Sequence, residues 1–113
     1  MKLVLDTNAY CLCDTGSEPA LKALERAGSI FLPAIAYGEL YYGFKHGSRF
    51  LENMRRLDRF IDDFDASVIT VDKDVARKFG DIHASLRSKG RPIPTNDIWI
   101  GACCMSVGGT LLT

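Results

Sequence analysis

The sequence predicts an α/β fold in which a central parallel sheet is covered by helices on both faces, a three-layer α/β/α arrangement. Short apolar runs alternate along the chain with longer stretches in which apolar residues recur every three or four positions. Strands joined by right-handed helical crossovers show this alternation, and such strands run parallel. The chain has 113 residues, 47% hydrophobic and 25% charged, which suits one globular domain.

The first strand and the first two helices are expected before residue 28. Residues 2–5 form an apolar run that ends in the polar residues 6–8, which suits a strand that turns directly into a helix. A second helix is expected over residues 18–27. Ser17 is its candidate N-cap, and Gly28 marks its end.

Two helices of opposite character follow the second strand, which is expected over residues 29–32. Pro33 suits a helix start, and residues 34–45 then form a mostly apolar helix. In residues 49–64, apolar side chains recur at spacings of three and four with charged residues between them. We therefore expect this later helix to expose one face to water.

The last third of the chain repeats the alternation. Residues 68–71 suit a third strand, and residues 72–89 have helical spacing up to Gly90, which ends the helix. A further helix is expected over residues 95–105, with Thr95 or Asn96 as its cap. A glycine turn then leads to a fourth strand at residues 110–113.

Composition and charge exclude several classes of protein. No apolar run is long enough to cross a bilayer or to form a secretion signal, so we expect a cytoplasmic protein without a membrane partner. The cysteines, at Cys11, Cys13, Cys103 and Cys104, have neither zinc-site nor redox-motif spacing and are expected to be reduced. The formal charge is zero, which by itself gives no support to nucleic-acid binding.

Three carboxylates stand in apolar stretches that are far apart in the sequence. Glu39 is the only charge in residues 30–44, Asp97 is the only one between Ile93 and Val107, and Asp6 follows the first strand. Burial of an unpaired carboxylate is costly, and one shared hard cation would explain all three. Mg²⁺ prefers oxygen ligands, so we predict an Mg²⁺ site, or an Mn²⁺ site, at the carboxyl edge of the sheet. Asp6, Glu39 and Asp97 are its candidate ligands and catalytic groups.

Each acid also has a structural interpretation. Asp6 could cap the helix after the first strand, Glu39 could be an exposed helical residue, and Asp97 is favoured near a helix N-terminus by the macrodipole. Four polar neighbours are candidates to orient the acids or metal-bound water: Thr7, Asn8, Thr95 and Asn96. They could equally be ordinary helix caps.

Four segments, taken in order, carry a family resemblance. LVLDTNAY, AIAYGELYYG, PIPTNDIWIGA and the terminal GGTLLT together resemble a PIN domain of the VapC toxin type across the whole chain. The resemblance implies a PIN-like fold and a metal-dependent endoribonuclease with Asp6, Glu39 and Asp97 as its acids and Asn8 close by. It also implies a homodimer and a cognate antitoxin that binds and inhibits the toxin.

The resemblance also sets an expectation about the end of the chain. The family pattern places a fourth acid just after the strand that corresponds to residues 111–113, and the sequence stops there. We therefore expect residues 1–113 to be a single PIN-like domain that lacks its C-terminal end. The three acids present suffice for one ion.

Under this interpretation, a metal-activated water hydrolyses RNA phosphodiesters by in-line displacement. Basic residues that could hold the RNA backbone, or could be solvated surface, are Lys45, Arg49, Arg87, Lys89 and Arg91. An alternative is a non-catalytic PIN-like interaction module that binds a protein partner through the aromatic helix over residues 34–45. A phosphatase with Asp6 as nucleophile is a further alternative, although Asn8 stands where a second acid is wanted.

Overall fold

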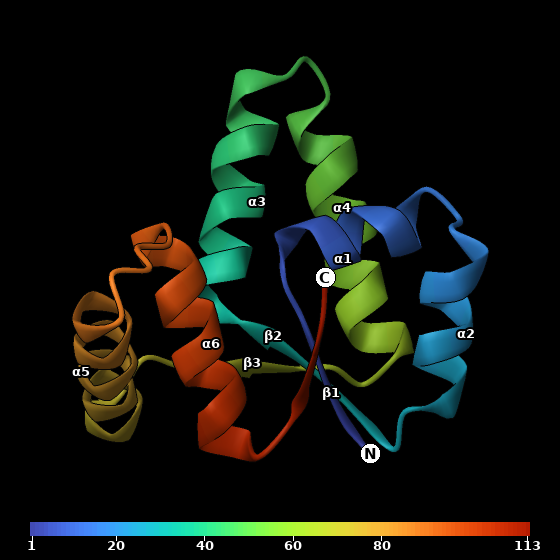
Figure 1. Cartoon of the computed structure of the whole chain (residues 1–113). Helices are drawn as coiled ribbons and strands as arrows, with labels where there is room; N and C mark the ends of the chain where they lie inside the picture. The colour runs from blue at the N-terminus through green and yellow to red at the C-terminus, as the bar shows by residue number, and fades with distance from the viewer.

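The computed structural model describes all residues from Met1 to Thr113 as four strands and six helices (Figure 1). The strands are β1 (Lys2–Leu5), β2 (Ser29–Pro33), β3 (Ser67–Ile69) and β4 (Thr110–Leu112). The helices are α1 (Thr7–Asp14), α2 (Glu18–Arg26), α3 (Ala34–His46), α4 (Phe50–Asp63), α5 (Lys73–Ser88) and α6 (Thr95–Val107). All strand pairs are parallel, in the order β3-β2-β1-β4, which confirms the predicted central sheet.

Side chains of β1 point alternately into two apolar layers, one on each face of the sheet. Leu3 and Leu5 belong to a core formed mainly with residues of α1 to α4, to which α6 adds Ile100, whereas Val4 packs with residues of α5 and α6. All three side chains are buried, as expected for a central strand covered on both faces. The predicted three-layer α/β/α arrangement is confirmed.

The register brings several chain segments to one edge of the sheet. Leu5 of β1 lies opposite Leu112 of β4, and the backbone N–H of Asp6 donates to the Leu112 carbonyl at 3.3 Å. The strand β1 passes directly into α1, and β2 passes directly into α3. The first turns of α1 and α3 therefore start from the carboxyl edge, where ligands of open α/β sheets bind.

Some element ends differ from the expectations. Ser17 occupies the N-cap position of α2, but its side chain makes no capping hydrogen bond. Pro94, not Thr95 or Asn96, is the N-cap residue of α6. The third strand is found at Ser67–Ile69 and not at residues 68–71, and Asp72 caps α5 because its carboxylate accepts from the Val75 N–H at 2.9 Å.

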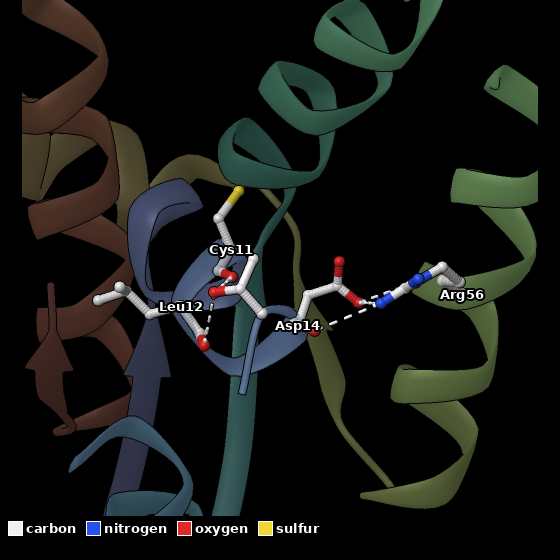
Figure 2. A network of polar contacts seen from close by, with 5 residues as sticks. Cys11, Leu12, Asp14 and Arg56 are labelled. Carbon is white, nitrogen blue, oxygen red and sulfur yellow. Dashed lines mark hydrogen bonds and ion pairs between the residues drawn. The ribbon is translucent and has the colours of Figure 1, made fainter. Parts of the chain in front are cut away.

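A surface ion pair connects the end of α1 to α4 (Figure 2). Arg56 donates from Nε and Nη2 to Asp14 Oδ1 at 3.0 and 2.8 Å, and from Nη2 to the Asp14 carbonyl at 3.3 Å. The hydrogen bond and charge of Asp14 raise the pKa of the Arg56 guanidinium. This contact holds α4 beside α1 on the outer surface of the larger core. None of the six helices combines the length and apolarity needed to cross a membrane.

Candidate active site at the carboxyl edge

Asp6 is the residue at which the central strand becomes a helix. Its Oδ1 accepts a hydrogen bond from the Ala9 N–H at 2.7 Å, so Asp6 is the side-chain cap of α1. The second carboxylate oxygen makes no hydrogen bond within the chain. The capping interpretation is thus correct, and it leaves one oxygen available for a ligand.

Glu39 links three helices. Its Oε1 accepts from Thr7 Oγ1 of α1 at 2.6 Å, and its Oε2 accepts from Asn96 Nδ2 of α6 at 3.2 Å. The side chain is half-buried on α3. Two of the four predicted polar neighbours, Thr7 and Asn96, therefore contact one of the predicted acids. Because Thr7 follows Asp6 and Asn96 precedes Asp97, the segments that carry all three acids lie close together.

Asp97 lies in the first turn of α6 and is exposed. Its carboxylate makes no hydrogen bond or ion pair within the chain, and its place near the helix N-terminus is favourable for a negative charge. The remaining two predicted neighbours, Asn8 and Thr95, are also exposed, and their side chains make no hydrogen bonds within the chain. These three residues therefore face solvent at the edge of the site.

The expectation that apolar surroundings bury the acids is wrong. No polar or charged side chain of the chain is fully buried; Glu39 is half-buried and Asp97 is exposed. The apolar run around Glu39 misleads because α3 has apolar residues on its outer face too. Tyr41 and Tyr42 of this helix are exposed, whereas Ala36 and Leu40 form its buried face.

The donor set of the site has the chemistry that Mg²⁺ or Mn²⁺ requires. Asp6, Glu39 and Asp97 offer only oxygen ligands, and none of them pairs with a lysine or arginine. No group of three or more His, Cys, Asp or Glu side chains is arranged to hold a metal ion. Mg²⁺ is commonly bound through one or two carboxylates, with waters and substrate phosphates completing its shell. The residues fit that open form of binding, and the full ligand set stays a prediction.

A hollow of about 630 Å³ lies beside Glu39, between α3 and the start of α6. Ile35 and Tyr42 line it together with Gly38 and Asn96, and Tyr42 is 66% exposed. A Cβ added to Gly38 would meet no atom within 4 Å, so this glycine leaves the hollow open and does not serve close packing. Sequence analysis did not single out Ile35, and it considered Tyr42 only as part of the aromatic helix that could bind a protein partner. Their spacing of four before and three after Glu39 places them on its helical face, which was the available signal.

Comparison with known proteins agrees with this architecture. Residues 3–113 match the family model described as PIN domain. Ribonuclease VapC2 from Haemophilus influenzae is 29% identical over 115 residues, which cover 100% of this chain and 86% of that protein.

Two solved structures have the same fold. One is VapBC2 from Rickettsia felis bound to a DNA fragment from its promoter, with a TM-score of 0.87 and 22% identity. The other is VapBC-1 from nontypeable Haemophilus influenzae, with a TM-score of 0.86 and 21% identity. Each match covers 100% of this chain and 86% of the solved chain. Since the family model spans nearly the whole sequence, the chain belongs to the PIN-domain family.

Proposed function

We propose that this chain is a magnesium-dependent endoribonuclease, the toxin of a toxin–antitoxin pair, and that Asp6, Glu39 and Asp97 are its acidic site residues. The observation that carries the proposal is the pair of hydrogen bonds that Thr7 and Asn96 donate to Glu39. These bonds hold the segments that carry the three acids, which are distant in sequence, close together near the carboxyl edge of the parallel sheet. The similarity to a protein named as a ribonuclease supports RNA as the substrate.

Each acid has a distinct part in this proposal. Asp6 turns one oxygen to the Ala9 N–H, which fixes the side chain and leaves the second oxygen for the ion. Asp97 offers an exposed carboxylate from the first turn of α6. Glu39 is held in one orientation by its two donors and binds the ion or its water. Bound Mg²⁺ supplies the Lewis acid that polarises a phosphodiester and activates water for in-line hydrolysis.

The chain's other residues position the substrate and the water. Asn8 and Thr95 flank the acids and are proposed to hydrogen-bond metal-bound water. The open hollow beside Glu39 is proposed to receive the nucleotide next to the scissile bond, with Tyr42 offering an aromatic face to a base. The reaction needs no covalent enzyme intermediate, which distinguishes it from a phosphatase with Asp6 as nucleophile.

An antitoxin and a second copy of the chain are the proposed protein partners, acting in the cytoplasm. The similar solved structures are VapBC assemblies, which supports a partner of antitoxin type. Tyr41, Tyr42 and Leu51 are large apolar side chains exposed on α3 and α4, and exposed apolar patches commonly mark protein interfaces. Light scattering of the isolated chain after size exclusion tests the homodimer directly.

The test of the function uses the full chain, a structured RNA and Mg²⁺. Cleavage is expected with Mg²⁺, and it is expected to disappear with EDTA or with Asp6→Asn. Asparagine keeps the cap, because its side-chain carbonyl accepts the Ala9 N–H as the carboxylate does. Asp81→Asn, an exposed acid on α5, is the matched control and should cleave normally.

Two outcomes would contradict the proposal. Cleavage that survives both EDTA and Asp6→Asn would exclude a metal site at Asp6. A folded wild-type chain that cleaves no RNA with Mg²⁺ or with Mn²⁺ would instead favour the alternative of a non-catalytic module that binds a protein partner. Thermal unfolding with and without Mn²⁺ is an independent measurement. Mn²⁺ should raise the melting temperature of the wild type and raise that of Asp6→Asn less, because a ligand bound to the native state stabilises it.

A further inference from the structure

A second hollow, of about 290 Å³, lies between the end of α5 and the segment that leads into α6. Its lining includes three basic side chains, His83, Arg87 and Arg91, all of them exposed. The apolar part of the lining comes from Leu86, Ile93 and Ile98. The hollow therefore combines a shaped apolar wall with several hydrogen-bond donors and positive charge.

The end of α5 explains why the basic groups share one hollow. His83 and Arg87 are four residues apart, so they lie on the same face of the helix. Gly90 has a φ of 65°, in the left-handed region, and its N–H donates to the Arg87 carbonyl at 3.1 Å. The Arg91 N–H donates back to the Leu86 carbonyl at 2.9 Å, which completes a Schellman motif. This turn brings Arg91 back over the last helical turn, beside Arg87.

The charge of this hollow is not neutralised within the chain. The three ion pairs join Lys22 to Glu18, Arg56 to Asp14 and Lys78 to Asp74, so neither arginine of the hollow has an acidic partner. No aspartate or glutamate lines the hollow, whereas four other surface hollows each include at least one. Two guanidinium groups gathered without a counter-charge favour binding of an anion.

We propose that this hollow binds a phosphate of the RNA substrate at a distance from the scissile bond. A guanidinium matches two oxygens of one phosphate with parallel N–H donors, and a second arginine and a histidine can bind the remaining oxygens. The inference rests on the proposed function, because it assigns the ligand as part of the strand that is cut.

The position of the hollow favours the RNA backbone over a free phosphate ion. Ile98 lines the hollow and directly follows Asp97, one of the proposed catalytic acids. The six residue-to-residue steps from Arg91 to Asp97 span at most about 22 Å even when fully extended. A phosphate in the hollow and a phosphate at the acids are therefore within reach of one short RNA strand. The segment between them leads from the end of α5 to the start of α6 (Figure 1).

The test measures binding of the full chain to a short fluorescent RNA in EDTA, so that no cleavage occurs. The variant is Arg87→Gln/Arg91→Gln, and the charge-matched control is Lys73→Gln/Arg77→Gln near the start of the same helix. None of these four side chains makes an ion pair in the structure, and both variants remove two positive charges. Circular dichroism checks that each variant is folded. A third variant, Arg87→Lys/Arg91→Lys, keeps both positive charges but removes the planar guanidinium groups.

The hollow variant is expected to bind RNA about tenfold more weakly than wild type. The slope of log affinity against log salt should become shallower by about 0.7, the change expected for one lost phosphate contact on a single strand. The control should stay close to wild type, and the lysine variant should keep the salt slope while losing affinity. Sodium phosphate should compete with RNA more strongly for wild type than for the hollow variant, at matched ionic strength.

Different failures identify different errors. Equal RNA affinity in the hollow variant and the control would overturn this inference while leaving the proposed ribonuclease function intact. Phosphate competition that depends on the arginines, together with unchanged RNA affinity, would assign the hollow to a free anion and also overturn it. Absence of any RNA binding by the wild type would remove this inference and the proposed function together.

Discussion

Substitution of Thr7 by valine removes one hydroxyl from the proposed site and keeps the branched shape of the side chain. The Thr7 hydroxyl donates to Glu39 Oε1 at 2.6 Å, a length typical of a hydrogen bond to an ionised carboxylate. Such bonds contribute about 1.5–3 kcal/mol. Because Glu39 is only half-buried and keeps its bond from Asn96, the lower end of that range applies. A loss of about 1.4 kcal/mol in transition-state binding corresponds to about a tenfold lower kcat/KM.

The assay is Mg²⁺-dependent RNA cleavage, measured well below the melting temperature of each variant. Thr110→Val is the matched control, because it makes the same chemical change at an exposed hydroxyl that has no hydrogen bond, at the start of β4 and away from the carboxyl edge. The control should stay within about twofold of wild type, as for a neutral surface substitution. Wild-type kcat/KM in Thr7→Val would refute the reasoning, and so would an equal loss in both variants, which would show that the bond to Glu39 is not the cause.

Two further predictions concern the stability of the fold. A Cβ on Gly109 would lie 2.7 Å from Val4 Cγ2 and 3.2 Å from the Lys2 carbonyl, so Gly109→Ala should destabilise by about 1–3 kcal/mol through overpacking. A Cβ on Gly43 would meet open space inside a helix, so Gly43→Ala should stabilise the fold by up to about 1 kcal/mol. Melting temperatures of the two glycine variants that shift in the same direction would contradict these predictions. Burial, and secondarily the charge of Asp14, raises the pKa of Tyr10 from 10.0 to about 12. The unfolded chain therefore releases this proton first, and stability should fall between pH 10 and 12 more steeply in wild type than in Tyr10→Phe, as measured by urea unfolding.

The fold could be predicted because its determinants are local and repeated. The first strand was expected over residues 2–5 and is found as Lys2–Leu5, since an apolar run followed directly by a capping aspartate has few other solutions. Helix ends were less certain where caps compete. For α6, the two polar residues at its start suggested a side-chain cap, whereas Pro94 precedes the helix and leaves Asn96 to bond Glu39 instead.

The candidate site was predictable in its location and less so in its contacts. Asp6 follows a strand, and the carboxyl ends of parallel strands share an edge, so its place follows from topology alone. The bond from Thr7 to Glu39 depends on how α1 and α3 cross, which no sequence pattern specifies. The basic hollow depends in the same way on the turn at Gly90, which decides whether Arg91 points toward Arg87 or away from it.

The exposure of Asp97 changes the physical reason for expecting a metal ion at this edge. A buried carboxylate would need a cation to offset its lost hydration, but an exposed one does not, so stability of the fold does not require the ion. Hydrolysis of a polymer gives a different reason: Mg²⁺ must keep coordination positions for water and for phosphate oxygens of the substrate. A closed cage of three buried acids would fill those positions and exclude an RNA strand. Asp6, with one oxygen uncommitted, and Asp97, open to solvent, leave them available, which favours a catalytic ion over a structural one.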